Sequence, residues 1–235
     1  VAKHGNRSMT SQSGSADLLE AAGVNIALTP EQIARCIKEI GVGFLFAQAH
    51  HSAMRYAGPI RQELRVRTIF NLLGPLTNPA GAERQLIGVF APEWQQPMAE
   101  VAKLLGSTHA MVVHANGLDE LSIAGTSNIV ELKDGEIQQY TIEPEDFGIA
   151  TQTVADLQAD SPASSLELVR HSLSGDDATG AADIVALNAG AAIYVAGIAD
   201  TLANGVAMSE DSIASGLAAE KLAELARGSR LMETV

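Results

Sequence analysis

The residues with the clearest chemistry stand at the start of the chain. Residues 3–7 read Lys-His-Gly-Asn-Arg, and hydroxyl side chains follow at Ser8, Thr10, Ser11, Ser13 and Ser15. Hydroxyls, backbone N–H groups next to glycine, and Lys or Arg charges are together the groups that bind a phosphorylated ligand. A solvated Ser-rich loop is the alternative. Because the cations alternate with the hydroxyls and a helix is predicted to begin at Ser15, the pattern favours an anion-binding loop.

A second candidate site is the carboxylate pair Asp119-Glu120. The pair follows an apolar run, Ala110–His114, and a short polar loop. Two adjacent hard oxygen ligands suit Mg²⁺, which usually binds one or two carboxylates together with phosphate oxygens. On the pair alone, capping of the next segment is the favoured interpretation. The presence of a phosphate-type loop in the same chain changes the preference to a magnesium site.

Arg61 and four histidines are the other side chains that could contact a ligand. Arg61 is either a solvated helix residue or a guanidinium that pairs with a ligand carboxylate, for which its planar geometry is well suited. The histidines show no His-x-x-x-His or Cys spacing typical of zinc, and we interpret them as hydrogen-bonding residues. They are His4, His50, His51 and His114.

The composition describes a globular chain packed by small aliphatic residues. Of its 235 residues 46% are hydrophobic, 18% charged and 4% aromatic, and there is one cysteine. Neither a bilayer-spanning run nor a secretory signal is evident, and a single cysteine excludes an internal disulfide. We therefore expect a reducing, cytoplasmic location. Cys36 is spaced with Ile33, Ile37 and Ile40 as on one helix face, which predicts a core position.

The charge is unevenly distributed. The chain has a net charge of −13, to which residues 1–110 contribute +2 and residues 111–235 contribute −15. Phosphate-binding chemistry is therefore expected in the first half. A nucleic-acid-binding module needs a basic surface, so the acidic balance argues against one.

The order of the predicted elements indicates an α/β fold. Gln85–Ala91 and Ala110–His114 are predicted strands on either side of a helix at Pro92–Leu105, which is the parallel βαβ arrangement. Asp134-Gly135 predicts a hairpin within Ile129–Ile142. In open α/β sheets ligands bind beyond the carboxyl ends of strands, where the candidate loops are expected.

Helices are predicted at both ends of the chain. Thr29 to Gln32 forms a capping box that opens a helix ending at Gly41. The remaining predictions are a helix at Ser15–Ala22 capped by Ser13 or Ser15, a strand at Gly43–Ala47, an irregular loop at Gly74–Pro79, a buried helix at Ala182–Gly197 and a final helix at Ser209–Ala226.

Five ordered motifs resemble the anthranilate phosphoribosyltransferase family of tryptophan biosynthesis. They are KHGNRSMTSQSGSAD, FLFAQAHHSAMR, RTIFNLLGPLTNPA, VVHANGLDE and EDFGI, and the resemblance covers essentially the whole chain. It implies transfer of the phosphoribosyl group of phosphoribosyl pyrophosphate (PRPP) to the amine of anthranilate, with release of pyrophosphate. It also implies a mixed, largely parallel sheet flanked by helices, of the nucleoside phosphorylase type, and Mg²⁺ as cofactor.

The resemblance assigns roles to individual residues. The PRPP contacts are implied to be Lys3, His4, Gly5, Asn6, Arg7, Ser8, Met9, Thr10, Ser11 and Ser15. The anthranilate contacts are implied to be Asn6 and Arg61, with His4 and Gly74 lining the pocket, and Asp119 and Glu120 match the magnesium ligands. No general base is assigned, because a neutral aromatic amine is already nucleophilic.

Two departures from the family pattern affect the expectations. Ser52 stands where many members have proline, which concerns local loop shape. The family's Gly-Thr-Gly-Gly-Asp loop and its small helical domain would precede Lys3. We therefore expect residues 1–235 to form one α/β catalytic domain that is incomplete at its N-terminus, inactive alone and monomeric, whereas full-length members are homodimers. The alternatives are a pyrimidine nucleoside phosphorylase and a non-catalytic nucleic-acid-binding relative.

Overall fold

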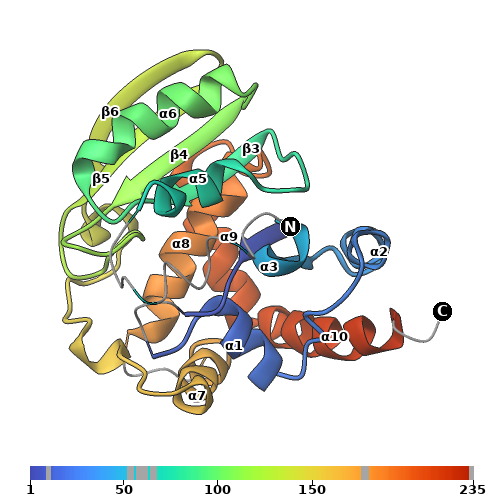
Figure 1. Ribbon diagram of the computed structural model, residues 1–235. Helices are drawn as coiled ribbons and strands as arrows, with labels where there is room; N and C mark the ends of the chain where they lie inside the picture. Colours follow the sequence, from blue (N-terminus) through green and yellow to red (C-terminus); the bar gives the residue numbers. More distant parts are fainter. Residues whose placement is uncertain (9–11, 52–55, 57–62, 64–67, 176–179, 233–235) are drawn as a thin grey trace. The chain divides into compact units, whose positions relative to one another are not determined.

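The computed structural model describes residues 1–8, 12–51, 56, 63, 68–175 and 180–232 (Figure 1). The chain divides into two compact units. Unit 1 comprises Val1–Gly81, Ala159–Arg170 and Leu217–Val235, and unit 2 comprises Ala82–Gln158 and His171–Gly216. Each unit contains its own β-sheet. The expectation that residues 1–235 act as one catalytic domain stays a prediction.

Unit 1 is built around a short parallel strand pair. Strand β1 (Ala2–Gly5) pairs with β2 (Gly43–Phe46), so that Gly5 lies opposite Phe46. Among the described residues, the helices that begin in unit 1 are α1 (Ser15–Ala21), α2 (Pro30–Ile40), α3 (Ala47–His50), α5 (Phe70–Leu76), α7 (Pro162–Ser172) and α10 (Leu217–Leu231).

Helix α2 confirms the capping prediction. The hydroxyl of Thr29 accepts from the Gln32 N–H at 3.3 Å, and the Gln32 side chain accepts from the Thr29 N–H at 2.9 Å. Gly41 ends the helix in the left-handed region, with φ of +90°. Cys36 is 0% exposed and packs in a core with Ile33. The apolar face of α2 therefore covers one side of the β1–β2 pair.

Unit 2 contains a four-stranded mixed sheet. Its strands lie in the order β3 (Arg84–Gly88), β4 (His109–His114), β5 (Ser127–Lys133) and β6 (Glu136–Ile142). The β3–β4 pairing is parallel and the other two are antiparallel. The predicted βαβ unit and hairpin are confirmed, and Asp134 and Gly135 take φ of +51° and +82° in the turn. An α/β fold with mixed sheets is thereby confirmed.

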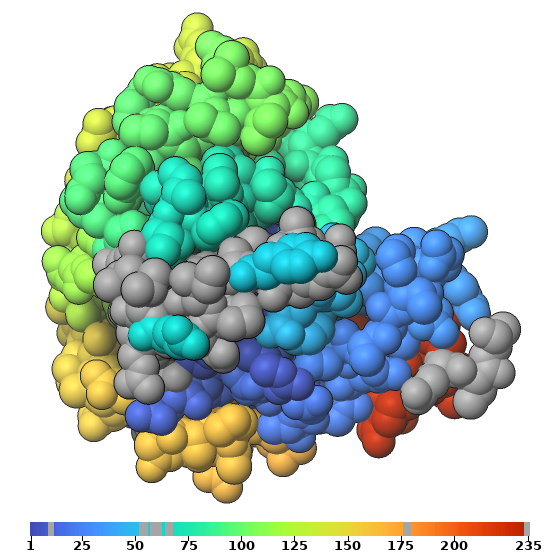
Figure 2. All heavy atoms as spheres, viewed as in Figure 1, coloured from blue at the N-terminus to red at the C-terminus, as the bar shows by residue number. Residues whose placement is uncertain are grey.

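Helices pack against this sheet. The 3₁₀ turn η1 (Pro92–Trp94) leads into α6 (Gln95–Leu104), and α8 (Ala181–Val195) and α9 (Leu202–Ala214) follow later. The 3₁₀ turns η2 (Pro144–Phe147) and η3 (Ala155–Leu157) lie between β6 and α7 in the chain. Met111 and Val113 of β4 form a core with Leu187 of α8. The outer side of α6 faces solvent (Figure 2), where Leu104 is 85% exposed.

Two predicted element boundaries are wrong. The predicted single helix at Ser209–Ala226 is two helices, because the chain breaks at Gly216, where φ is +77°, as it passes from unit 2 to unit 1. The predicted irregular loop at Gly74–Pro79 begins as helix, since α5 continues to Leu76. Pro75 removes only one N–H donor from this short helix, and the Thr77 hydroxyl donates to the carbonyls of Leu73 and Gly74, just before the proline.

Within the described part of the chain, no helix has the length and apolar character needed to cross a membrane.

Candidate functional site

The predicted PRPP loop, Lys3 to Ser11, begins within β1 and continues past its end, and Gly5 brings that end against α1. A Cβ atom at Gly5 would lie 2.4 Å from the Ser15 hydroxyl and 2.8 Å from the Phe44 ring. The Ser15 hydroxyl also donates to the Asn6 carbonyl at 3.4 Å. The structure therefore brings together Gly5, Asn6 and Ser15, three of the residues assigned to PRPP.

The next close approach joins Ser8 to Gly14. A Cβ atom at Gly14 would lie 2.3 Å from the Ser8 nitrogen, so the two backbone segments are in direct contact. The predicted caps of α1, Ser13 and Ser15, are wrong: Gly14 occupies the N-cap. Its N–H donates to Asp17 Oδ2 at 3.0 Å, and the Ser8 N–H donates to the same oxygen at 3.0 Å. A carboxylate accepts more N–H donors than a hydroxyl, which explains why Asp17 replaces the serines.

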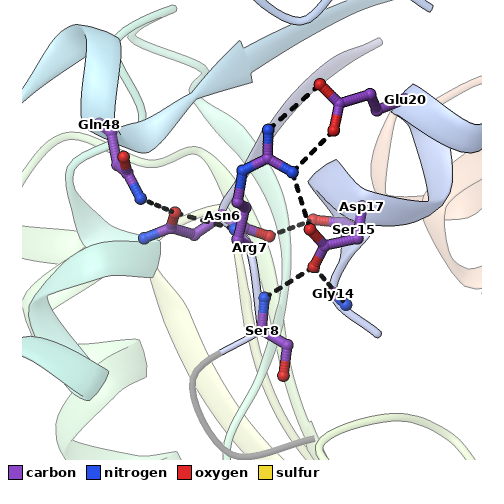
Figure 3. Close-up of polar contacts among 8 residues, drawn as sticks. All are labelled: Asn6, Arg7, Ser8, Gly14, Ser15, Asp17, Glu20 and Gln48. Carbon is purple, nitrogen blue, oxygen red and sulfur yellow. Dashed lines mark hydrogen bonds and ion pairs between the residues drawn. The ribbon is translucent and has the colours of Figure 1, made fainter. Parts of the chain in front are cut away.

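Arg7 is paired with the acidic side of α1 (Figure 3). Its guanidinium donates to Asp17 Oδ1 at 2.9 Å and to both Glu20 oxygens at 2.8 and 3.2 Å. It also lies 5.7 Å from the centre of the Phe46 ring. The Ser8 N–H, together with Arg7 and Gly14, lowers the pKa of Asp17, and Glu20 and Asp17 raise the pKa of Arg7. The PRPP contact assigned to Arg7 stays a prediction, and the structure shows what else holds this side chain.

Asn6, assigned to both substrates, has a fixed amide. Its Oδ1 accepts from the Arg7 N–H at 2.8 Å and from Gln48 Nε2 at 3.3 Å (Figure 3). Because both donors point at the oxygen, the Nδ2 side of the amide is the side that can donate to a ligand. Gln48 was absent from the sequence prediction. Its position in the family motif FLFAQAHHSAMR, between Phe46 and the histidine pair, could have indicated a role near the site.

His4 lies next to Gly74, as the predicted anthranilate pocket requires. The Gly74 backbone hydrogen-bonds the His4 ring, and the Nε2 atoms of His4 and His51 are 3.1 Å apart. Burial lowers the pKa of His4, and the neighbouring His51 lowers it further. Burial likewise lowers the pKa of His50. A neutral His4 ring is therefore favoured at pH 7.

The carboxylate pair Asp119-Glu120 follows a tight turn after β4. Ala115 and Leu118 exchange two backbone hydrogen bonds of 3.1 and 2.8 Å, and Asn116 and Gly117 between them take φ of +46° and +87°. Asparagine and glycine are the residues that adopt this left-handed conformation with least strain. The turn places both carboxylates at the exposed end of the sheet.

Two contacts fix this turn on unit 2. A Cβ atom at Gly88 of β3 would lie 1.6 Å from the Asp119 carbonyl oxygen. On the other side, Asn188 of α8 accepts from the Leu121 N–H at 2.9 Å and donates to the Leu121 carbonyl at 2.8 Å. The backbone on either side of the carboxylates is thus anchored, while both residues are exposed. Exposed, paired carboxylates on a fixed backbone suit Mg²⁺, which keeps several of its waters.

The predicted residues belong to both units. The PRPP and anthranilate residues described above lie in unit 1, and the metal pair lies in unit 2. Four predicted residues lie outside the described residues: Arg61, Met9, Thr10 and Ser11.

Comparison with known proteins places the chain in a class. Residues 1–219 match the glycosyl transferase family, a/b domain. The chain is 58% identical over 230 residues to the anthranilate phosphoribosyltransferase of Cellvibrio japonicus, and 58% identical over 232 residues to that of Marinomonas sp.. These alignments cover 96% and 98% of this chain and 67% of each relative. The chain thus spans about two thirds of the length of these relatives.

Solved structures show the same fold. The anthranilate phosphoribosyltransferase of Thermus thermophilus superposes with a TM-score of 0.91 at 46% identity, over 98% of this chain and 68% of the other. The Saccharomyces cerevisiae enzyme, solved in complex with PRPP and Mg, gives a TM-score of 0.87 at 24% identity, over 100% of this chain and 65% of the other.

The fold and the family match define the chain as the α/β domain of a glycosyl transferase. Within that class it belongs to the anthranilate phosphoribosyltransferase family. The resemblance read from the five motifs is confirmed.

Proposed function

We propose that this protein transfers the phosphoribosyl group of PRPP to the amine of anthranilate, releasing pyrophosphate. The observation that carries the proposal is the folding of the family's longest motif in unit 1, where Gly5, Asn6, Ser8 and Ser15 converge at the end of a parallel strand. Polar groups at that end of a strand are well placed to bind a phosphorylated ligand.

The reaction needs positioning and charge neutralisation more than covalent help. A bond forms between the anthranilate nitrogen and C1 of the ribose, the bond from C1 to the pyrophosphate oxygen breaks, and the amine releases a proton. Pyrophosphate is already a good leaving group, so the protein must align two substrates and stabilise the departing charge. The residues proposed to bind PRPP are Lys3 to Ser11, together with Ser15.

The second substrate is proposed to bind at Asn6, His4, Gly74 and Arg61. Because Asn6 Oδ1 already accepts from Arg7 and Gln48, its amide nitrogen is oriented to donate to a substrate oxygen. A neutral His4 ring can hydrogen-bond the substrate without adding charge. Arg61 is proposed to pair with the carboxylate of anthranilate.

Asp119 and Glu120 are proposed to hold Mg²⁺. The two exposed carboxylates on an anchored backbone fit a cation that keeps water and takes phosphate oxygens. Bound there, Mg²⁺ would offset the negative charge of pyrophosphate.

The test, carried out on the full-length protein, is the loss of anthranilate fluorescence in the presence of PRPP and Mg²⁺. Arg61→Ala is expected to raise the KM for anthranilate far more than that for PRPP, since losing a charged hydrogen bond costs roughly 1.5–3 kcal/mol. Arg35→Ala is the matched control, because Arg35 pairs with Glu39 on the exposed face of α2.

Two results would contradict the proposal. Equal rises in both KM values would give Arg61 a general structural role. Turnover of a pyrimidine nucleoside with phosphate, in place of anthranilate with PRPP, would favour the nucleoside phosphorylase alternative.

A further inference from the structure

We propose that Asp17 is the positioning residue of the PRPP site. It holds Arg7 and Ser8 against Gly14, so that the residues that contact the phosphoribosyl donor are presented in one fixed arrangement. The inference rests on the proposed function and adds to it a residue that acts through its neighbours and touches neither substrate.

The geometry is that of one carboxylate with three donors. Asp17 Oδ2 accepts the N–H groups of Ser8 and Gly14, both at 3.0 Å, and Oδ1 accepts from the Arg7 guanidinium at 2.9 Å. Figure 3 shows these bonds converging on Asp17 from the segment after β1 and from the start of α1. The Asp17 side chain is 18% exposed, so it is largely shielded from competing water.

A simple helix cap does not account for this arrangement. Capping of α1 requires only the bond from the Gly14 N–H to Asp17. The bonds from Ser8 and Arg7 come from residues outside the helix, on a segment that touches Gly14 so closely that a Cβ atom there would lie 2.3 Å from the Ser8 nitrogen. Asp17 therefore joins two segments, and both belong to the proposed PRPP site.

A carboxylate is the group that this position needs. All three partners are donors, and an ionised aspartate offers only acceptors. Asparagine has nearly the same shape but would turn an N–H₂ group towards at least one donor, which leaves that donor unsatisfied. The positive charge of Arg7 is shared between the carboxylates of Asp17 and Glu20, which reduces the repulsion between Asp17 and an anionic ligand.

Asn6 accepts from the Arg7 N–H but also has supports of its own, which predicts an unequal effect on the two substrates. Its carbonyl accepts from the Ala16 N–H at 3.2 Å, and its side chain accepts from Gln48. Loss of the Asp17 carboxylate is therefore expected to disturb Arg7 and Ser8 more than Asn6. The KM for PRPP is expected to change more than the KM for anthranilate.

The experiment measures both KM values, PRPP binding by calorimetry with Mg²⁺ present, and the thermal midpoint, for the wild type and four variants. Asp17→Asn is expected to raise the KM and Kd for PRPP about tenfold or more, the size expected for one charge-assisted hydrogen bond. Glu20→Gln is expected to raise the KM and Kd for PRPP only roughly two- to threefold, since Arg7 keeps its bond to Asp17. Asp17→Glu keeps the charge and the helix cap, so this variant is expected to fold. Its affinity for PRPP is expected to lie between those of the wild type and Asp17→Asn.

Glu31→Gln is the matched control. Glu31 is also an acidic residue in the first turn of a unit 1 helix, and its own backbone and Thr29 are its partners. Its substitution is expected to leave both KM values unchanged.

The outcomes of this experiment either support or overturn the positioning role of Asp17. Unchanged PRPP binding in Asp17→Asn, or equal rises in both KM values with a lowered thermal midpoint, would overturn the positioning role and leave the proposed function in place. If Asp17→Asn does not fold, unchanged PRPP binding in Asp17→Glu overturns the role and weakened binding supports it. A full-length wild-type protein that neither binds PRPP nor consumes anthranilate would overturn the proposed function, and this inference with it.

Discussion

The two candidate sites are loops of the same kind that are held in place by different forces. Each follows a parallel strand, β1 in unit 1 and β4 in unit 2. The segment after β1 is fixed by charged hydrogen bonds to Asp17 and Glu20. The turn after β4 is fixed by backbone contact with Gly88 and by the Asn188 amide.

This difference shows how each site depends on its surroundings. Charged hydrogen bonds change with pH, because they require an ionised carboxylate. Close backbone packing does not change with pH, but it tolerates no added atom, since protein interiors are already densely packed. The unit 1 segment is therefore expected to be sensitive to pH. The unit 2 turn is expected to be sensitive to substitutions that add atoms.

The largest expected effect is on the carboxylates of the unit 2 turn. In the double variant Asp119→Asn, Glu120→Gln, turnover is expected to fall by about 10²–10³, since removing one electrostatic stabiliser of a transition state typically costs that much. Folding is expected to be retained, because both residues are exposed and the amides have nearly the shape of the carboxylates they replace. The measurement is turnover against Mg²⁺ concentration, with a urea unfolding curve as control. An unchanged Mg²⁺ titration would remove these residues from the metal site.

Substitution of Gly88 tests the packing of the same turn. In Gly88→Ala the new Cβ would meet the Asp119 carbonyl at 1.6 Å, so the backbone must move, at a cost of about 1–3 kcal/mol in unfolding free energy. The Mg²⁺ concentration needed for activity is expected to rise as well.

Gly135→Ala is the control for Gly88→Ala. Gly135 has open space around it but φ of +82°, so its substitution is expected to cost about 1 kcal/mol without changing the Mg²⁺ response. A Gly88→Ala protein with a normal Mg²⁺ response would show that packing does not set the position of the carboxylates.

Gly14 tests whether packing also matters in unit 1. In Gly14→Ala the new Cβ would lie 2.3 Å from the Ser8 nitrogen, and about 1–2 kcal/mol of stability is expected to be lost. The loss of stability in Gly14→Ala should be smaller than that in Gly88→Ala, because the added Cβ comes closer to its neighbour at Gly88 than at Gly14. Gly74→Ala, where nothing lies within 4 Å, is the stability control. A cost at Gly14 above that at Gly88, by urea unfolding, would contradict the comparison.

The pH dependence tests the charged contacts and is the smallest effect. Hydrogen bonds from Ser8, Arg7 and Gly14 lower the pKa of Asp17 below its ordinary value of 3.8. The unfolded chain therefore binds the proton more readily. The stabilisation is complete above the ordinary value and is lost as the pH falls through the lowered pKa of the folded state.

Urea unfolding between about pH 7 and about pH 3 checks this. The difference in stability between wild type and Asp17→Asn is expected to shrink below about pH 4, whereas the cost of Gly88→Ala should stay constant with pH. A constant difference for Asp17 would show that its charge is not what holds the segment.

Features set by neighbouring residues could be predicted from the sequence. The capping box of Thr29 and Gln32 depends on residues three positions apart, and the Asp134-Gly135 turn depends on the residues within it. The burial of Cys36 followed from its spacing with isoleucines on one helix. These three features follow from local backbone geometry, so they can be predicted from the spacing of residues in the sequence.

Features set by distant residues could not be predicted. The need for glycine at position 88 arises because the Asp119 backbone crosses β3. The Asp17 contacts join residues from the strand end and the helix start, and the serines nearby gave a plausible but wrong cap. The break between α9 and α10 falls where the chain changes units, which no local pattern marked.

The sequence by itself determined the α/β class, the family and the types of residue that make the candidate sites. Motif order and local periodicity depend only on the positions of residues along the chain. Only the tertiary structure decided which groups hold those residues: Asp17 and Arg7 in unit 1, Gly88 and Asn188 in unit 2. The physical reason is that hydrogen bonds and steric contacts act over a few ångströms in space, so folding alone brings distant partners within reach.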